Sequence, residues 1–241
     1  MKRKSIRPLS VGLAIVLVSL FATVTTQAVP GESHLPDALR AGTARVLAYQ
    51  ASAASLSTVF QQGVSPNQYY AGAADTYIDL YSPAANSGGS GTMKLHSGSG
   101  GRQRLLIKFD ISSIPSTATV QEATLTLYAW YRNPTYRVTA YAYPVKRHWN
   151  ENDANWNVAT SANFWSLPGC DNPVYDYDST LVAATPLNYT ERYYSWDVID
   201  MAQDCVSNPL SNEGLLIVSE GFSAQYQFRT SQFSAPNQRP S

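Results

Sequence analysis

The sequence predicts an all-β protein with a jelly-roll-like antiparallel β-sandwich, and three observations support this prediction. From about residue 67 onward, apolar and polar residues alternate with a period of two. Turn-forming stretches such as PAANSGGSG and SSIPSTAT separate the alternating segments at short intervals. The chain has 16 Tyr among 241 residues and only 14% charged residues, a composition typical of extracellular β-proteins.

Residues 1–28 carry the three parts of a secretory signal peptide. A basic MKRKSIR precedes the apolar run 11–24, and small residues at Thr26 and Ala28 suit a cleavage site. The run is short for a membrane-spanning helix, although an uncleaved anchor is the alternative. We therefore expect a secreted, extracellular protein with no integral membrane domain once the signal is cleaved. Residues 29–66 contain few large apolar side chains and are predicted to be a flexible spacer.

The predicted domain covers residues 67–241 and is large enough for one hydrophobic core. Its apolar alternation predicts strands at 74–81, 104–111, 123–131, 136–145, 193–199, 214–220 and 225–231. Helical spacing of Val198, Met201, Ala202 and Cys205 predicts one short helix over 197–206. The long irregular segment 148–190 is expected to be functional or to cover a sheet face, anchored by its tryptophans Trp149, Trp156 and Trp165.

Cys170 and Cys205 are the only cysteines of the chain. In an oxidising compartment they are candidates for a disulfide, which would stabilise the domain by about 4 kcal/mol through loop closure. The alternative is a pair of buried free thiols.

The strand 123–131 has apolar residues on one face and rings on the other. Leu125 and Leu127 share the first face, whereas Tyr128 and Trp130 share the second. The next strand places Tyr141 and Tyr143 opposite its own apolar face. If the two strands form a hairpin, these four rings lie together. Such rings could stack on sugars, so they are candidate carbohydrate-binding residues. Alternatively, the segment 148–190 covers them as a second small core.

Arg104 and Lys108 share the polar face of the strand 104–111. They could line an anionic groove. The alternative is that both simply solubilise a surface strand. Arg132, Arg137 and Lys146 flank the aromatic residues and could bind the carboxylates of an acidic polysaccharide, or each is an ordinary solvated surface charge.

The stretch RQRLLIKFDISSIPSTATVQEATLTLYAW resembles the DNRLRE domain, the disaggregatase-related repeat that is also grouped as carbohydrate-binding module family 96. HWNENDANWN, YYSWDVIDMAQDCVSNPLSNEGLLIVSE and YQFRTSQFSAPNQRPS match later blocks of the family in order. Asn155, Ile199 and Gln232 depart from the usual Thr, Thr and Glu. The resemblance implies a secreted or surface-attached jelly roll, often appended to glycan-active enzymes, and some members bind uronic-acid polysaccharides such as alginate. It implies no catalytic residue.

The family pattern continues for one strand past Arg239-Pro240, whereas this chain stops at Ser241. We therefore expect the final strand to be missing, with a sheet edge exposed. On this expectation the chain is a fragment or an interrupted gene product, and other domains of a larger parent protein are candidate partners.

Jelly-roll binding modules often hold a structural calcium ion through strand and loop carboxylates. Asp75, Asp171 and Asp197 are the metal-ligand candidates here, although no EF-hand pattern is present. Asp197 alternatively caps the predicted helix.

The sequence favours a non-catalytic carbohydrate-binding module. The three histidines are scattered, and no H-E-x-x-H, G-x-S-x-G or Cys–His pattern occurs. The net charge of zero gives no reason to expect a nucleic-acid partner. The alternatives are a structural or adhesive module that binds protein and, more distantly, a polysaccharide lyase or hydrolase that uses a pair such as Glu151 and Asp153.

Overall fold

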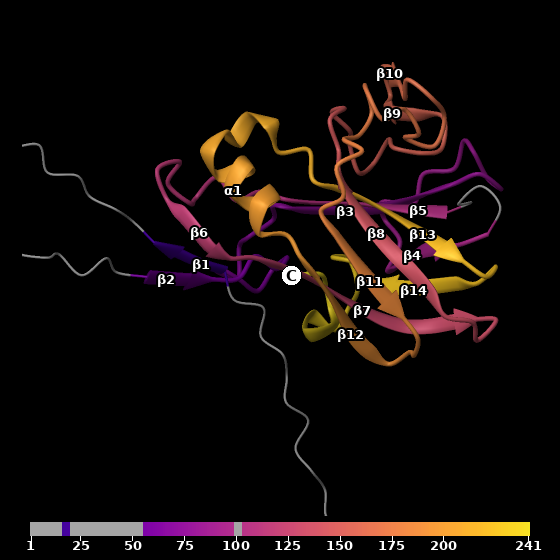
Figure 1. Ribbon diagram of the computed structural model, residues 1–241, viewed down its shortest axis with the longest axis horizontal. Coiled ribbons are helices and arrows are strands. Elements are labelled where there is room, and N and C mark those ends of the chain that lie inside the picture. Colours follow the sequence, from indigo (N-terminus) through magenta and orange to yellow (C-terminus); the bar gives the residue numbers. More distant parts are fainter. Residues whose placement is uncertain (1–15, 20–54, 99–102) are drawn as a thin grey trace, which may run out of the picture.

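The computed structural model describes residues 16–19 (backbone only), 55–98 and 103–241. The rest of the predicted signal peptide and residues 29–54 of the predicted spacer lie outside the described residues. The described part is mostly antiparallel β-sheet with one α-helix, as predicted (Figure 1). Its elements are β1 Val16–Ser19, β2 Ser55–Thr58, β3 Ala73–Asp79, β4 Thr92–His96, β5 Gln103–Phe109, β6 Thr119–Glu122, β7 Thr124–Asn133, β8 Val138–Pro144, β9 Val158–Thr160, β10 Asn163–Phe164, β11 Ala183–Leu187, β12 Arg192–Asp197, α1 Ile199–Ser207, β13 Leu215–Gly221 and β14 Gln225–Arg229.

A nine-stranded sheet folds over on itself to form the sandwich. Its order is β11-β8-β13-β5-β4-β14-β7-β12, and β3 pairs with the other edge of β5. Strands β4 and β5 share a single residue pair, His96 with Gln103, where the sheet passes from one layer to the other. The first layer is thus β11-β8-β13-β5-β3 and the second is β12-β7-β14-β4.

The main core fills the space between the layers. Leu105 on β5 and Ile217 on β13 come from the first layer, whereas Leu127 on β7 and Phe228 on β14 come from the second. All four side chains are fully buried. Alternation with a period of two supplies these apolar faces, as the sequence predicted.

The predicted hairpin between β7 and β8 is wrong. β7 pairs with β12 and β14, whereas β8 pairs with β11 and β13. The chain crosses from the second layer to the first between Asn133 and Val138. Both strands turn their apolar faces toward the same core from opposite sides. Their aromatic faces therefore point to opposite outer surfaces.

The segment 148–178 covers part of the first layer. Trp149, Trp156 and Trp165 are all buried, and they pack with Leu106 and Leu216 on the outer face of the sheet. This confirms the prediction that the tryptophans anchor the segment. Large apolar area removed from water at three positions holds an otherwise irregular stretch in place.

The predicted disulfide is not formed. Both cysteines are free and buried. Cys170 lies in the tryptophan cluster above the first layer, whereas Cys205 lies on α1. Burial raises the pKa of both thiols, that of Cys205 to about 11. The two thiols belong to separate packed regions, so the alternative of two buried free thiols holds.

The packed body begins before residue 67. Phe60 is buried and its ring centroid lies 5.6 Å from that of Tyr70. Arg239 donates to the carbonyl of Gln62, and Gln61 donates to the carbonyl of Arg239. Residues 60–66, assigned to the spacer from the sequence, are therefore tied to the C-terminal stretch.

Candidate functional site

The outer face of the first layer brings together four of the six predicted carbohydrate-binding residues. On β8, Tyr141 stands opposite Val218, and Tyr143 stands opposite Leu216. Arg104 and Lys108 lie on the outer face of β5, whose Leu106 pairs with Leu216. The register of three neighbouring strands therefore gathers residues that are far apart in the sequence.

A cleft of about 390 Å³ opens on this face, and we call it the Tyr143 cleft. Strand β13 forms its floor, and residues of the segment 148–178 form one wall. Its lining comprises Gly98, Arg104, Tyr143, Asp171, Tyr177, Leu216, Val218, Ser219 and Glu220. Pockets of this size with a few polar groups are suited to small ligands or to segments of larger ones.

Two tyrosines form the aromatic part of the cleft. The ring centroids of Tyr143 and Tyr177 are 5.6 Å apart with an interplanar angle of 65°. Both side chains are half-buried. Burial raises the pKa of both hydroxyls, and the negative charges of Glu220 and Asp171 add to the effect on Tyr143 and Tyr177 respectively. Both phenols therefore stay protonated and can donate as well as accept hydrogen bonds near neutral pH.

Arg104 is held rigidly at the edge of the cleft. Its Nη1 lies 2.8 Å from Asp171 Oδ1 and donates to the Gly169 carbonyl at 2.7 Å. Its guanidinium also stacks over the Trp156 ring at 5.3 Å. Arg104 itself is buried, whereas the Asp171 side chain is 53% exposed. The exposed carboxylate can therefore accept hydrogen bonds from a ligand while the arginine keeps it in place.

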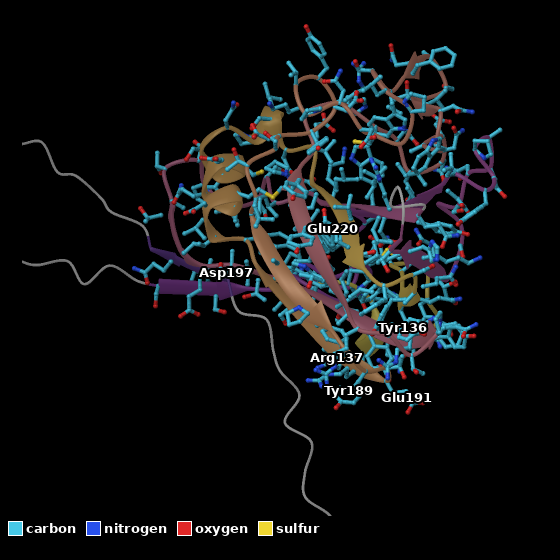
Figure 2. The ribbon with its side chains drawn as sticks, turned by 45° about the vertical axis from the view of Figure 1, so that its right-hand side comes forward. Tyr136, Arg137, Tyr189, Glu191, Asp197 and Glu220 are labelled. Carbon is cyan, nitrogen blue, oxygen red and sulfur yellow. The ribbon has the colours of Figure 1, made fainter. Side chains whose placement is uncertain are left out.

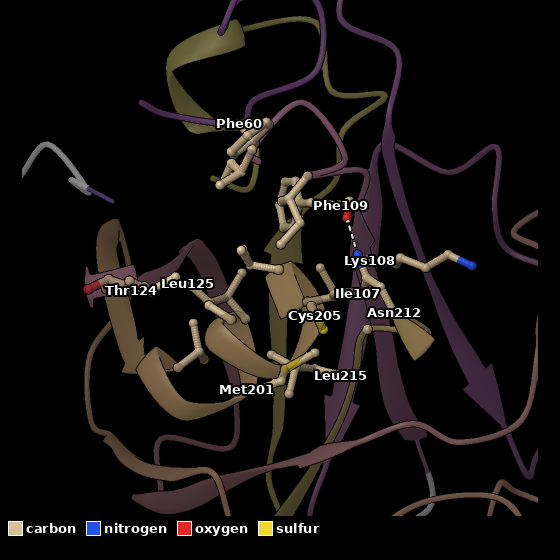
Figure 3. A pocket seen from close by; sticks show the side chains of 18 of the residues that line it. Phe60, Ile107, Lys108, Phe109, Thr124, Leu125, Met201, Cys205, Asn212 and Leu215 are labelled. Carbon is tan, nitrogen blue, oxygen red and sulfur yellow. Dashed lines mark hydrogen bonds between the residues drawn. The ribbon is translucent and has the colours of Figure 1, made fainter. Parts of the chain in front are cut away.

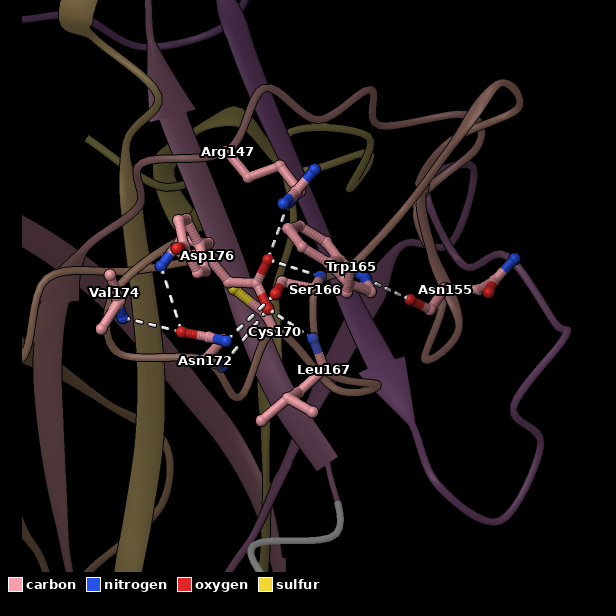
Figure 4. A network of polar contacts seen from close by, with 10 residues as sticks. Arg147, Asn155, Trp165, Ser166, Leu167, Cys170, Asn172, Val174 and Asp176 are labelled. Atoms are coloured by element: carbon pink, nitrogen blue, oxygen red, sulfur yellow. Dashed lines mark hydrogen bonds and ion pairs between the residues drawn. The ribbon is translucent and has the colours of Figure 1, made fainter.

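A buried carboxylate organises the loop that carries Asp171 and Tyr177. Asp176 is fully buried and its Oδ1 lies 2.7 Å from Arg147 Nε (Figure 4). The same carboxylate accepts hydrogen bonds from the backbone amides of Ser166, Leu167 and Asn172. Because these bonds satisfy both oxygens, the wall of the cleft is pre-organised rather than mobile.

The cleft does not carry net positive charge. This differs from the prediction that Arg104 and Lys108 line a groove for an anionic ligand. Arg104 faces Asp171 in an ion pair, and Glu220 lines the same cleft. Lys108 lies outside the cleft, where its Nζ is 3.0 Å from Glu213 and 5.2 Å from the centre of the Trp149 ring. Both predicted cations therefore have carboxylate partners.

Tyr128 and Trp130 lie on the outer face of the second layer instead. Tyr128 packs edge-to-face against Tyr193 of β12, with centroids 5.0 Å apart. The C-terminal stretch, rather than the segment 148–190, partly covers this face. Tyr193 donates to the carbonyl of Asn237. Phe233 contacts the guanidinium of Arg229, which also lies over the Trp130 ring. The predicted alternative of coverage by 148–190 is thus wrong for these two rings, but it does describe the contact between Tyr143 and Tyr177.

Arg229 is a functional candidate that the sequence analysis missed. Its guanidinium lies between two rings, 4.2 Å from the centre of Trp130 and 3.9 Å from that of Phe233. No carboxylate partner is found for it within the described residues. The Nε of Arg229 and the Nε1 of Trp130 are both buried without a hydrogen-bond partner there. Alternation on β14 could have placed Arg229 on an outer face, but pairing with Trp130 depends on the strand order.

A further aromatic group lies at one end of the sandwich. Tyr136 and Phe222 are exposed, with ring centroids 5.3 Å apart. Tyr189 is also exposed and lies near the guanidinium groups of Arg132 and Arg192. Figure 2 shows Tyr136 and Tyr189 at this end. These rings sit on loop tips, outside the Tyr143 cleft.

The three predicted calcium ligands are not brought together. Asp75 is buried and accepts a hydrogen bond from the Ser231 amide, Asp171 pairs with Arg104, and Asp197 accepts from the amide of Ile199. Among the described residues, no group of three His, Cys, Asp or Glu side chains could hold a metal ion. The predicted set therefore does not form a common site.

Of the two carboxylates considered for catalysis, that of Glu151 has structural contacts. Glu151 Oε1 accepts hydrogen bonds from the Asp75 amide at 3.0 Å and from Gln232 Nε2 at 2.7 Å. The Asp153 amide instead belongs to a local turn closed on Asn150. Glu151 thus ties its loop to β3.

Comparison with known proteins agrees with this architecture. The model of carbohydrate-binding module family 96 matches residues 66–239. Because this match covers most of the chain, the protein belongs to that family. A search of curated proteins returned no match. No helix in the described ranges is long and apolar enough to cross a membrane.

Proposed function

We propose that the protein is a secreted, non-catalytic module that binds polysaccharide through the Tyr143 cleft. Family membership supports carbohydrate binding in general. The observation that points to this cleft is the combination of two half-buried tyrosines with an exposed, fixed carboxylate in one concavity. Tyrosine rings stack on the C–H faces of sugars at little cost in rotamer entropy, and polar side chains with fixed positions select hydroxyl orientation.

The charge of the cleft favours a hydroxyl-rich, neutral glycan there. Asp171 and Glu220 outnumber Arg104, so a uronate carboxylate would meet net negative charge. Carboxylates are good acceptors for sugar hydroxyls. A neutral chain therefore suits this site better than alginate or pectin does.

Affinity gel electrophoresis tests this proposal directly. The full chain and its Tyr143→Ala variant are run through gels that contain neutral polysaccharides (β-glucan, xylan, galactomannan) or acidic ones (alginate, pectin). We expect at least one neutral gel to retard the full chain, and the variant to lose most of that retardation. Tyr141→Ala, on the same strand face but outside the cleft lining, is the matched control. Equal retardation of all three proteins would contradict the assignment to the cleft.

Binding of an acidic polysaccharide is a second candidate, and Arg229 is the observation that favours it. A guanidinium that has no carboxylate partner among the residues that the structure describes, and that is fixed between Trp130 and Phe233, is suited to a uronate group. Retardation by alginate that is lost in Arg229→Gln but kept in Tyr143→Ala would support this candidate. Retardation by alginate that both variants keep would contradict it.

A further inference from the structure

Three connections that cross between the layers meet at one end of the sandwich, which we call the loop tip. They join β7 to β8, β11 to β12 and β13 to β14, through residues 134–137, 188–191 and 222–224 respectively. Val138 at the start of β8 stands opposite Leu187 at the end of β11 and opposite Gly221 at the end of β13. Asn133 at the end of β7 stands opposite Gln225 at the start of β14. The register of the strands therefore gathers all three connections at the same end.

Two buried tyrosine hydroxyls hold the connections in place. Tyr226 is fully buried, and its hydroxyl lies 3.0 Å from the carbonyl oxygens of both Tyr136 and Leu187. The hydroxyl of Tyr194, which is also buried, accepts a hydrogen bond from the amide of Tyr189 at 2.8 Å. The loop tip is therefore pre-organised, and little ordering is required when it meets a partner.

Aromatic rings project from all three connections. Phe222 is 72% exposed although its side chain has no polar atom, and its ring centroid lies 5.3 Å from that of Tyr136. Tyr136 and Tyr189 are each 52% exposed. Exposed apolar groups that gather at one place, rather than being scattered singly over the surface, mark an interaction site.

Arginines accompany these rings. The guanidinium groups of Arg132 and Arg192 lie 5.8 and 6.0 Å from the centre of the Tyr189 ring, and Figure 2 shows Arg137 at the same end. Among the residues that the structure describes, none of these three arginines forms an ion pair. Glu191 is the one acidic residue in the three connections. The chain as a whole has no net charge, but the loop tip carries an excess of positive charge.

We propose that the loop tip binds the surface of an anionic phospholipid bilayer. Guanidinium groups bind phosphate through paired hydrogen bonds, and each cation near an anionic surface adds to the attraction. Phe222 would enter the boundary between headgroups and acyl chains, whereas the tyrosines would lie at the level of the headgroups. A soluble acidic polysaccharide could also pair with the arginines, but it would leave Phe222 in water. The combination of an apolar ring with unpaired arginines therefore favours a lipid surface.

The opposite end of the sandwich provides a matched control. There the side chains of Ile107, Leu125 and Met201 turn toward an internal apolar cavity of about 110 Å³ (Figure 3). Because β12 begins at the loop tip and runs into α1, Ser211, which follows α1, lies at this opposite end. Ser211 and Ser223 are both exposed, and Ser223 belongs to the loop tip. A cysteine at either position can be labelled selectively, because both native thiols are buried.

Fluorescence of a polarity-sensitive dye tests the proposal on the full chain. The dye is attached at Ser223→Cys or Ser211→Cys, and each chain is mixed with vesicles of phosphatidylcholine alone or with added phosphatidylglycerol. We expect a blue shift only for the dye at position 223 and only on the anionic vesicles. In the Ser223→Cys chain, Arg137→Gln should weaken vesicle binding about fivefold, and Phe222→Ser should weaken it about tenfold. Leu210→Ser, which removes a 95% exposed apolar side chain near Ser211, should have no effect.

Several results would overturn the proposal. Equal blue shifts at both dye positions, or binding that Arg137→Gln and Phe222→Ser leave unchanged, would place the contact elsewhere, for example in the apolar run 11–24. Equal shifts on neutral and anionic vesicles, or no shift on either, would also contradict it. A blue shift caused by alginate without vesicles would make an acidic polysaccharide the occupant instead. None of these outcomes depends on glycan binding in the Tyr143 cleft.

Discussion

The two outer faces of the sandwich both carry tyrosine and tryptophan, but their surroundings differ. On the first layer, Tyr143 lines a concave cleft whose wall is fixed by the buried carboxylate of Asp176. On the second layer, Trp130 stacks under Arg229 and the C-terminal stretch covers part of the face. The comparison shows that aromatic residues on a strand do not define a binding site by themselves. The segment that packs beside them decides whether a cavity with polar walls remains.

The largest expected effect comes from removing the carboxylate that fixes the cleft wall. Asp176→Ala leaves Arg147 and three backbone amides without their partner. We expect the free energy of unfolding to fall by about 3–5 kcal/mol, as for other broken buried ion pairs. Urea denaturation followed by tryptophan fluorescence measures this.

Asp178→Ala is the matched control, because Asp178 lies two residues away and pairs with Lys146 at the surface. We expect its effect to stay within about 1 kcal/mol. If the two variants lost equal stability, the claim that Asp176 organises the wall would be wrong.

The second prediction is that the stability of the folded chain depends on pH through Asp75, a buried residue of β3 that accepts a hydrogen bond from the Ser231 amide. Burial raises the pKa of Asp75 to about 7, and the nearby charge of Glu151 adds to this effect. Between about pH 4 and 7 the unfolded chain releases this proton while the folded chain keeps it. Stability should therefore decrease as the pH rises through this range, by about 4 kcal/mol from this group alone.

Thermal or urea denaturation at several pH values measures the trend. Asp75→Asn, which resembles the protonated acid, should flatten it and should gain stability relative to the unaltered chain at pH 8. An unchanged pH profile in the variant would show that another group is responsible.

A smaller effect concerns the cysteines. Because Cys170 and Cys205 are buried free thiols in separate regions, a thiol reagent should react slowly with the native chain and should find two thiols after denaturation. Reducing agent should leave the melting temperature unchanged. A drop in melting temperature on reduction would reinstate the disulfide.

The sequence predicted most of the fold because alternation with a period of two is a local signal. All seven predicted strands and the helix are present. The strand β11 was missed because its Pro186 suits an edge strand and weakens the pattern, and β4 was missed because it is short and bounded by glycine-rich turns. The pairing of β7 and β8 could not be derived, because their short connection is compatible both with a hairpin and with a crossing between layers.

The candidate site was only partly predictable for the same reason. Tyr143 and Arg104 could be assigned to outer faces, since each alternates with core residues of its own strand. That Tyr177 and Asp171 join them depends on how the segment 148–178 folds over the sheet. Arg229 reaches Trp130 only through the pairing of β14 with β7. Contacts between strands that are distant in sequence carry this information, and periodicity does not.

Isothermal titration calorimetry tests the difference between the two faces most directly. A neutral oligosaccharide derived from a polysaccharide that retards the full chain is titrated into Tyr143→Ala and into Trp130→Ala, each verified as folded by its melting curve. The account predicts that affinity falls at least tenfold in Tyr143→Ala and stays within twofold in Trp130→Ala. The reverse result, a loss confined to Trp130→Ala, would move the glycan site to the second layer and contradict the central claim.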